Sequence, residues 1–173
     1  MRLIVAITGA SGVTLGEKFI KKLPKDIEKH IILSKNAKTV FQKEQNIFTY
    51  LDNEISASIA SGSFGCDSMA VIPCSMNTLA KISCGISDNL TSRAASVILK
   101  ENKKLLLAPR EMPFSAIMLE NMLKLSRLGV IISPPILGYY AKPTNLEMME
   151  DFLIGKWFDS LKIEHNLYKR WKG

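Results

Sequence analysis

The chain has 173 residues, of which 47% are hydrophobic and 23% are charged, and its formal net charge is +7. This length and apolar content predict a single domain over residues 1–173, with a sizeable core. No apolar run approaches the roughly 20 residues that cross a membrane, and no signal-peptide pattern opens the chain, so we expect a cytoplasmic protein without a membrane partner. The lysines are scattered and no recognition motif accompanies them, which argues against nucleic acid and favours small phosphorylated ligands.

The three cysteines are odd in number and match no Cys-x-x-Cys spacing, so they predict neither a disulfide framework nor a zinc site. We expect Cys66, Cys74 and Cys84 to be reduced, buried thiols, and we expect no bound metal. The two histidines, His30 and His165, are expected to lie at the surface and away from any site.

Apolar strands alternate with helical segments along the chain. The first strand, Leu3–Ile7, is an unbroken apolar run, and the helix Val13–Leu23 follows it. The polar region Asn46–Ser58 is expected to be a surface excursion. Further strands are predicted at His30–Leu33, Met69–Ile72, Lys104–Ala108 and Val130–Ile132, and further helices at Asn36–Glu44, Leu79–Cys84, Asn89–Glu101 and Ser115–Leu128. This rhythm predicts the α/β class, with a doubly wound parallel sheet between two layers of helices.

The turn Gly9–Gly12 lies between the first strand and the first helix. Free backbone N–H groups and the positive end of the helix dipole gather there, and glycines let an anion approach, so the segment predicts a phosphate cradle. A dinucleotide fingerprint needs G-x-G-x-x-G and an acidic residue ending the second strand, whereas the third glycine here is Gly16 and the second strand ends at Ser34. A tight turn without a ligand is the structural alternative.

Ligands of doubly wound sheets bind beyond the carboxyl ends of the strands, which makes the residues after each strand informative. Pro73–Thr78 places hydroxyl and amide groups at the start of a helix, where plain N-capping is the alternative to ligand binding. Arg110 and Glu111 follow another strand and suit a phosphate clamp and a proton carrier, or else a structural ion pair. Pro134–Tyr140 follows the last strand. The sequence therefore predicts a ligand site at this edge of the sheet.

Seven segments resemble, in order and spacing, the UbiX-type flavin prenyltransferases, and the resemblance extends from Met1 to Trp171. They are Gly9–Gly12, Ser34–Ala37, Ala60–Phe64, Pro73–Ala80, Asp88–Leu90 with Arg93–Ala95, Arg110–Pro113, and Pro134–Pro135. The resemblance implies a Rossmann-like, single flavin-binding domain. It also implies a metal-independent enzyme that joins a dimethylallyl group from dimethylallyl phosphate to N5 and C6 of reduced FMN. The implied product serves UbiD-type decarboxylases, as in ubiquinone biosynthesis, and the implied assembly is a homo-oligomer, a dodecamer in the family, with sites between subunits.

The resemblance also implies roles for single residues. Glu111 matches the family's acidic residue for proton transfer, and Ser11 and Glu44 are further catalytic candidates. The implied cofactor-binding residues are Gly9, Ala10, Ser11, Ser34, Ser75, Met76, Asn77, Thr78 and Arg110. The implied substrate-binding residues are Lys100, Tyr140, Lys156 and Trp171, of which the lysines and Tyr140 would hold the allylic phosphate. The chain departs from the family's usual Pro-Pro-x-Pro-Ala-Phe-Tyr over residues 134–140, and a more mobile loop is expected there.

Two other functions stay open at this point. FMN-dependent cysteine decarboxylases resemble the chain through Pro73–Thr78, but they need an active-site histidine, and neither histidine is expected at the site. A non-enzymatic flavin carrier of the flavodoxin kind tends to be acidic and has no use for Glu111 beside phosphate-binding lysines. The predicted helix Ser115–Leu128 is apolar over most of its circumference, which indicates burial in a subunit interface. The sequence does not distinguish a monophosphate from a diphosphate donor.

Overall fold

The computed structural model describes residues 1–34 and 46–170 of the chain. In these ranges six strands form one parallel sheet with the order β3-β2-β1-β4-β5-β6. They are β1 Arg2–Ile7, β2 Glu28–Leu33, β3 Ile47–Leu51, β4 Ser68–Cys74, β5 Lys104–Pro109 and β6 Ile131–Ile132. The strand order reverses between β1 and β4, and ligands of such sheets bind beyond the carboxyl ends of the strands at this point. The predicted doubly wound parallel sheet is confirmed.

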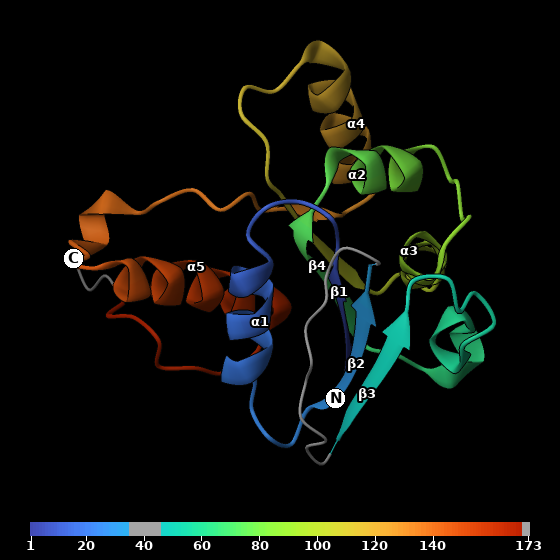
Figure 1. Cartoon of the computed structure of the whole chain (residues 1–173), viewed down its shortest axis with the longest axis horizontal. Helices are drawn as coiled ribbons and strands as arrows, with labels where there is room; N and C mark the ends of the chain where they lie inside the picture. Colours follow the sequence, from blue (N-terminus) through green and yellow to red (C-terminus); the bar gives the residue numbers. More distant parts are fainter. Residues whose placement is uncertain (35–45, 171–173) are drawn as a thin grey trace.

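Helices cover both faces of the sheet, which gives the expected three layers (Figure 1). They are α1 Val13–Lys22, α2 Met76–Ser83, α3 Leu90–Lys100, α4 Ala116–Arg127 and α5 Leu146–Leu161. Helices α1 and α5 cover one face and α2 and α3 the other, while α4 stands at the carboxyl end of the sheet next to α2. Short 3-10 turns lie at η1 Ser58–Ala60, η2 Gly62–Phe64 and η3 Tyr139–Ala141. Over the described ranges, no helix is both long and apolar enough to cross a membrane.

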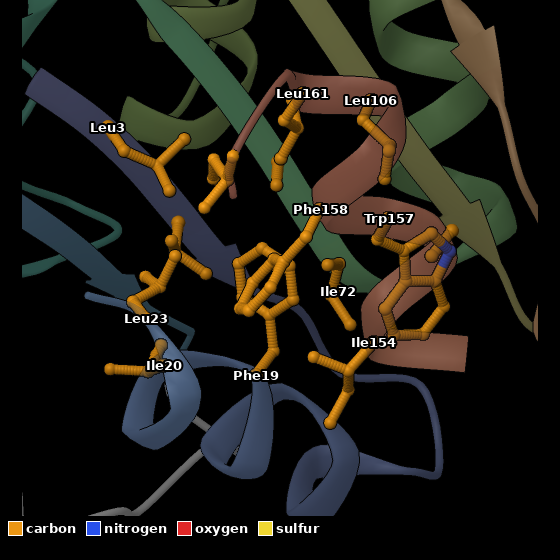
Figure 2. Close-up of a cluster of buried hydrophobic side chains, with 14 of the residues drawn as sticks. Leu3, Phe19, Ile20, Leu23, Ile72, Leu106, Ile154, Trp157, Phe158 and Leu161 are labelled. Atoms are coloured by element: carbon orange, nitrogen blue, oxygen red, sulfur yellow. The ribbon is translucent and has the colours of Figure 1, made fainter. Parts of the chain in front are cut away.

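Aromatic packing joins α1 to α5. Phe19 of α1 meets the rings of Phe158 and Trp157 edge-on, with centroids 5.0 and 6.2 Å away, and all three side chains are buried (Figure 2). Each buried side chain of this size stabilises the fold by about 1.5–3 kcal/mol. Lys22 and Asp151 add an ion pair of 2.7 Å between the same helices. Because α1 begins at the predicted cradle, this packing fixes α5 relative to it.

Two elements of the fold escaped the sequence analysis. The region Asn46–Ser58 is not a mere excursion, because it contains the edge strand β3. Three of the five β3 residues are exposed and none is buried, so no buried apolar run marks the strand. Helix α5 has seven buried residues spread around its circumference, and it therefore lacks the polar face by which a surface helix is recognised. The predicted helix Asn36–Glu44 lies outside the described residues.

The cysteine prediction is correct for two residues and wrong for one. Cys66 and Cys74 are buried free thiols, whereas Cys84 is an exposed one. Burial raises the pKa of Cys66 to about 11 and that of Cys74 to about 12, so both stay protonated at neutral pH. Cys84 follows the last residue of α2, where the chain turns out of the core.

The prediction of surface histidines is wrong. His30 is 1% exposed, and the side chain of His165 is 3% exposed. Both ring nitrogens of His30 have partners, since Nε2 lies 2.9 Å from Glu28 Oε1 and Nδ1 lies 3.1 Å from the Tyr50 hydroxyl. Burial lowers the pKa of His30 despite the opposing effect of Glu28. A polar ring that is fully paired is tolerated in a core, and a sequence does not reveal such pairing.

Candidate functional site

The turn between β1 and α1 has the geometry of a phosphate cradle. Gly12 adopts a φ of 104°, in the left-handed region that glycine tolerates, and it is the N-cap of α1 without a side-chain cap. A Cβ at Gly16 would lie 2.3 Å from the carbonyl oxygen of Ile72, so only glycine lets α1 pack this closely on β4. Ser11 and Gly12 are exposed, and the first turn of α1 contains no acidic residue. The Ala10 N–H donates to the carbonyl oxygen of Thr8 at 2.9 Å, but the positive end of α1 is open to an anion.

Thr8 connects this turn to the start of α2. Its hydroxyl donates to the carbonyl oxygen of Pro73 at 2.8 Å and accepts from the backbone N–H of Ser75 at 2.8 Å. Ser75 is the N-cap of α2, because its Oγ accepts from the backbone N–H of Thr78 at 3.2 Å. The capping alternative for Ser75 is thus correct, and the flavin-binding roles of Ser75 and Thr78 stay predictions. Asn77 is exposed at the same helix start.

Ser34 follows β2, next to the end of β1. Its backbone N–H donates to the carbonyl oxygen of Ile7 at 3.2 Å. This bond fixes Ser34 at the carboxyl edge of the sheet, which is the edge formed by the carboxyl ends of the parallel strands. Its Oγ is buried and has no hydrogen-bond partner within the described part of the chain. A buried hydroxyl without a partner costs about 1–3 kcal/mol, and folded proteins rarely keep one without a reason. A ligand that bonds to Ser34 Oγ would remove this cost.

Arg110 and Glu111 follow β5 at the same edge, and both are exposed. Ser11, Arg110 and Trp157 line one small cavity, which brings the arginine next to the cradle. Glu111 Oε1 accepts from the backbone N–H of Met112 at 3.1 Å. Residues 1–34 and 46–170 contain no ion pair between Arg110 and Glu111, so the structural-pair alternative is not realised there. Both charges are available to a ligand.

A larger cavity adjoins these two residues. It has a volume of about 390 Å³ and lies between residues 109–114 and residues 134–136. Arg110 and Glu111 supply its charged groups, and its other lining side chains are apolar. Such a cavity combines a polar anchor with walls that keep water away from an apolar group.

Tyr140 and Lys156 are brought to one stretch of α5. The Tyr140 ring is 59% exposed and meets the Phe152 ring edge-on, with centroids 5.4 Å apart. Lys156 is exposed and comes four residues after Phe152 on α5, so Lys156 and Phe152 lie on the same side of the helix. Because Tyr140 contacts Phe152, this is also the side on which Tyr140 lies. Trp157, the next residue, lines the small cavity beside Arg110. Helix α5 therefore links this pair to the cradle.

Three other predicted site residues, Lys100, Glu44 and Trp171, are not found at the carboxyl edge among the described residues. Lys100 is the last residue of α3, and β5 begins four residues later. Lys100 therefore lies at the amino edge of the sheet, which is the edge formed by the amino ends of the strands. Its ammonium group forms an exposed ion pair of 2.8 Å with Glu101. A single chain therefore keeps Lys100 away from Arg110. Glu44 and Trp171 lie outside the described residues.

Two residues that organise the site were not predicted. Thr8 is 4% exposed and bridges β1 to the start of α2, and its place directly after a buried strand was a usable signal. Trp157 donates from Nε1 to both the carbonyl and the hydroxyl oxygen of Ser133, at 3.1 Å each. These bonds tie α5 to the end of β6. The role of Trp157 was missed together with α5.

Comparisons with known proteins agree with this geometry. The model of the family described as Flavoprotein matches residues 1–170. The flavin prenyltransferase UbiX of Helicobacter pylori is 52% identical, over 99% of this chain and 98% of that protein. The chain belongs to the UbiX-type flavin prenyltransferase family. The flavin prenyltransferase UbiX of Campylobacter jejuni, 48% identical over 99% of both chains, is a second such relative.

Solved structures of this family superpose closely on the chain. A dodecameric FMN-dependent UbiX-like decarboxylase from Escherichia coli O157:H7 gives a TM-score of 0.93 at 41% identity, with full coverage of both chains. AnUbiX (PadA1), in complex with FMN and dimethylallyl pyrophosphate, gives 0.92 at 38% identity, over 99% of this chain and 97% of that one. A PPC decarboxylase mutant, at 23% identity and a TM-score of 0.61, shares the fold alone. The predicted Rossmann-like flavoprotein fold is confirmed.

Proposed function

We propose that the protein is a flavin prenyltransferase that joins a dimethylallyl group to reduced FMN. The observation that carries the proposal is the set of unpaired polar groups at the carboxyl edge of the sheet. There an uncapped helix start, the exposed Arg110 and the Ser34 hydroxyl, which has no partner among residues 1–34 and 46–170, lie around the strand-order reversal. Membership of the family supports the same reaction.

The residues at this edge fit FMN. The turn Gly9–Gly12, with Ala10 and Ser11, would hold the flavin phosphate at the start of α1. Ser34 Oγ would gain a partner, which it lacks within the described part of the chain, and Arg110 would contact the flavin from the end of β5. Met76 and Asn77 at the start of α2 would border the flavin from a third strand end. FMN is therefore the expected flavin, in preference to riboflavin.

The reaction needs groups that stabilise a departing phosphate. When bound, reduced FMN supplies the electron-rich N5 and C6 atoms to which the dimethylallyl group is joined. Lys156 and Tyr140 would bind the phosphate as it leaves with the electrons of the broken C–O bond. Glu111 has one carboxylate oxygen outside its bond to Met112, and it would exchange the proton at the departing phosphate oxygen. The apolar walls of the larger cavity would shield the allylic cation from water.

A homo-oligomer belongs to this proposal. Lys100 reaches an allylic phosphate only if a second subunit presents its amino edge to the site. Helix α4 exposes Ile117, Leu119 and Leu123, each more than half exposed and on more than one side of the helix, as expected of a helix that other subunits cover. The E. coli relative is a dodecamer. We further propose a cytoplasmic enzyme whose product serves UbiD-type decarboxylases, including those of ubiquinone biosynthesis.

The two alternative functions are less well supported. A histidine-dependent decarboxylase needs an imidazole at the carboxyl edge, but His30 is bonded to Glu28 and Tyr50, and His165 is bonded to Asp159. The chain contains no further histidine. A mere flavin carrier has no use for Glu111 beside a larger cavity with apolar walls.

The proposal is tested by mixing the oligomer, reduced FMN and either dimethylallyl phosphate or dimethylallyl pyrophosphate under anaerobic conditions. Mass spectrometry of the released flavin should find the mass gain of one isoprenyl group with at least one donor. The donor that gives the faster mass gain is the preferred one, which decides whether the enzyme uses a monophosphate or a diphosphate. No mass gain with either donor, in protein that binds FMN, would refute the prenyltransferase and leave the flavin carrier.

A further inference from the structure

The chain after α5 folds back onto that helix around one carboxylate, Asp159. Its Oδ1 accepts from His165 Nε2 at 3.1 Å and from the Arg170 guanidinium at 2.7 Å, and its Oδ2 accepts from the Tyr168 hydroxyl at 2.5 Å. His165 Nδ1 accepts from the backbone N–H of Leu167, so Nε2 is the nitrogen that carries the proton. Burial alone would raise the pKa of Asp159, but its bonds with Arg170, Tyr168 and His165 hold it at about 2. Asp159 is therefore a charged anchor for residues 165–170.

The anchored tail packs against Phe152 of α5, which in turn contacts Tyr140. The Tyr168 ring lies 5.2 Å from the Phe152 ring, and the Tyr140 ring lies 5.4 Å from it. A continuous row of rings thus leads from Asp159 to Tyr140.

Two glycines let the backbone pack directly against the rings of this row. A Cβ at Gly155 would lie 2.5 Å from the Tyr168 ring and 2.7 Å from His165. A Cβ at Gly138 would lie 2.4 Å from the Phe152 ring. Gly138 is one of the positions where residues 134–140 depart from the family's usual sequence, and this contact supplies the physical reason. Because the backbone touches the rings at both ends, a shift of Tyr168 is passed on to the Tyr140 loop.

In the Tyr140 loop, Ala141 packs against the hydrophobic core, whereas both tyrosines are mostly exposed. Tyr139 and Tyr140 are 76% and 59% exposed, and η3 is held by two backbone hydrogen bonds, Ala141 N–H to Gly138 at 3.1 Å and Lys142 N–H to Tyr139 at 2.9 Å. Over the described ranges, Phe152 is the one aromatic ring that contacts Tyr140. The orientation of the Tyr140 hydroxyl therefore depends on where Phe152 is held.

We propose that Asp159 is a positioning residue for the allylic phosphate: through Tyr168 and Phe152 it holds the Tyr140 hydroxyl in place. This inference rests on the proposed function, in which Tyr140 binds that phosphate. Asp159 itself acts only through other residues. Its loss should weaken the use of the allylic donor and leave FMN binding intact, because the cradle is formed by the start of α1 and Asp159 makes no bond to it.

The test compares Asp159→Ala with Asp151→Ala. Both carboxylates are on α5, their side chains are 26% and 22% exposed, and each makes an ion pair, but Asp151 pairs with Lys22 of α1. We expect Asp159→Ala to raise the KM for dimethylallyl phosphate by about tenfold, because small misplacement of a binding group is costly, with no change in FMN affinity. Asp151→Ala should change neither quantity. Tyr168→Phe, which keeps the ring and removes one bond to Asp159, should give a smaller change in the same direction.

A double-mutant cycle separates positioning from general stability. In the Tyr140→Phe background the ring stays and the hydroxyl is gone, so Asp159→Ala should add little to the KM. Full additivity of the two effects, or an equal loss of FMN affinity, would overturn the inference. Turnover by the wild type together with an unchanged KM in Asp159→Ala would do the same.

Hydrogen exchange keeps the inference testable even if the proposed reaction fails. The amides of residues 138–142 should exchange faster in Asp159→Ala than in the wild type and in Asp151→Ala, because their support through Phe152 is weakened. Equal exchange in all three proteins would refute the row of contacts as a support. Absence of product in the wild type would refute the proposed function instead, so the two failures are distinguishable.

Discussion

The two edges of the central sheet use their polar residues in opposite ways. At the amino edge, Arg2 Nε bonds to Glu28 Oε1 at 3.2 Å, and Glu28 and Tyr50 satisfy both nitrogens of His30. At the carboxyl edge, Ser34 Oγ has no partner in the described ranges and Arg110 is exposed. Polar residues alone therefore do not mark a site. Unpaired polar groups at the carboxyl edge do, because a ligand bound there is the partner that removes their cost.

The amino edge contains one exception. Ser68 Oγ is also buried and without a partner in the described part of the chain. It begins β4, at the end of the sheet remote from the cradle. This hydroxyl provides an internal control for the comparison, because its Oγ is buried like that of Ser34 but lies at the other edge.

The largest effect is expected for Glu111→Gln. If Glu111 carries a proton, the amide should slow formation of prenylated flavin by roughly a hundredfold, the usual size of a general acid–base contribution, and leave the binding of FMN and donor intact. Timed mass spectrometry of the flavin measures the rate. Product formation at the wild-type rate would remove Glu111 from the chemistry, and a matching loss of FMN would assign it a purely structural role with Arg110.

A smaller effect is expected for Lys156→Ala. The KM for dimethylallyl phosphate should rise about tenfold or more, because a hydrogen bond to a charged group contributes about 1.5–3 kcal/mol, while FMN affinity stays as it was. Lys104→Ala, at the exposed start of β5 on the amino edge, is the matched control and should change neither. An equal decrease in FMN affinity in Lys156→Ala would mean that this lysine serves the flavin or the fold.

The two unpaired serines give a more modest comparison. Ser34→Ala should weaken FMN binding about threefold to tenfold, since a neutral hydrogen bond contributes about 0.5–1.5 kcal/mol. Ser68→Ala should leave FMN affinity unchanged. Fluorescence titration of FMN into both variants measures this. Equal effects of the two substitutions would contradict the distinction between the edges.

The smallest effect on function is expected for His30→Gln. Loss of the paired ring should lower the free energy of unfolding by about 1–3 kcal/mol without changing FMN affinity. Burial lowers the pKa of His30 below its ordinary value of 6.5, so the unfolded chain takes up this proton first. The stability difference between the wild type and His30→Gln should therefore shrink as the pH falls below 6.5. Urea titrations at several pH values test this, and a difference that grows towards acid would contradict it.

The sequence predicted those parts of the molecule whose apolar residues follow a regular pattern along the chain. The strand Leu3–Ile7 and the turn after it were predictable, because a buried parallel strand and a small-residue helix start are both local signals. The edge strand β3 and helix α5 were not, since one is too exposed and the other too apolar for its pattern.

The candidate site was predicted as a set of residues but not as an arrangement. Chain order indicated that Ser34 and Arg110 follow parallel strands, which was enough to gather them at one edge. The same chain order places Lys100 four residues before the strand that begins at Lys104, and hence at the other edge, but the sequence analysis did not use this signal. Chain order could not show the anchoring of Asp159, which depends on a tail that folds back on α5.

The central claim is that the carboxyl edge holds the flavin by its phosphate and prenylates it there. Its most direct test is to supply reduced FMN and reduced riboflavin in turn, each with dimethylallyl phosphate, and to follow the flavin mass. We predict an isoprenyl mass gain on FMN and little or none on riboflavin, since riboflavin has no phosphate for the turn Gly9–Gly12 to bind. Equal gains on both flavins, or none on FMN, would contradict the account.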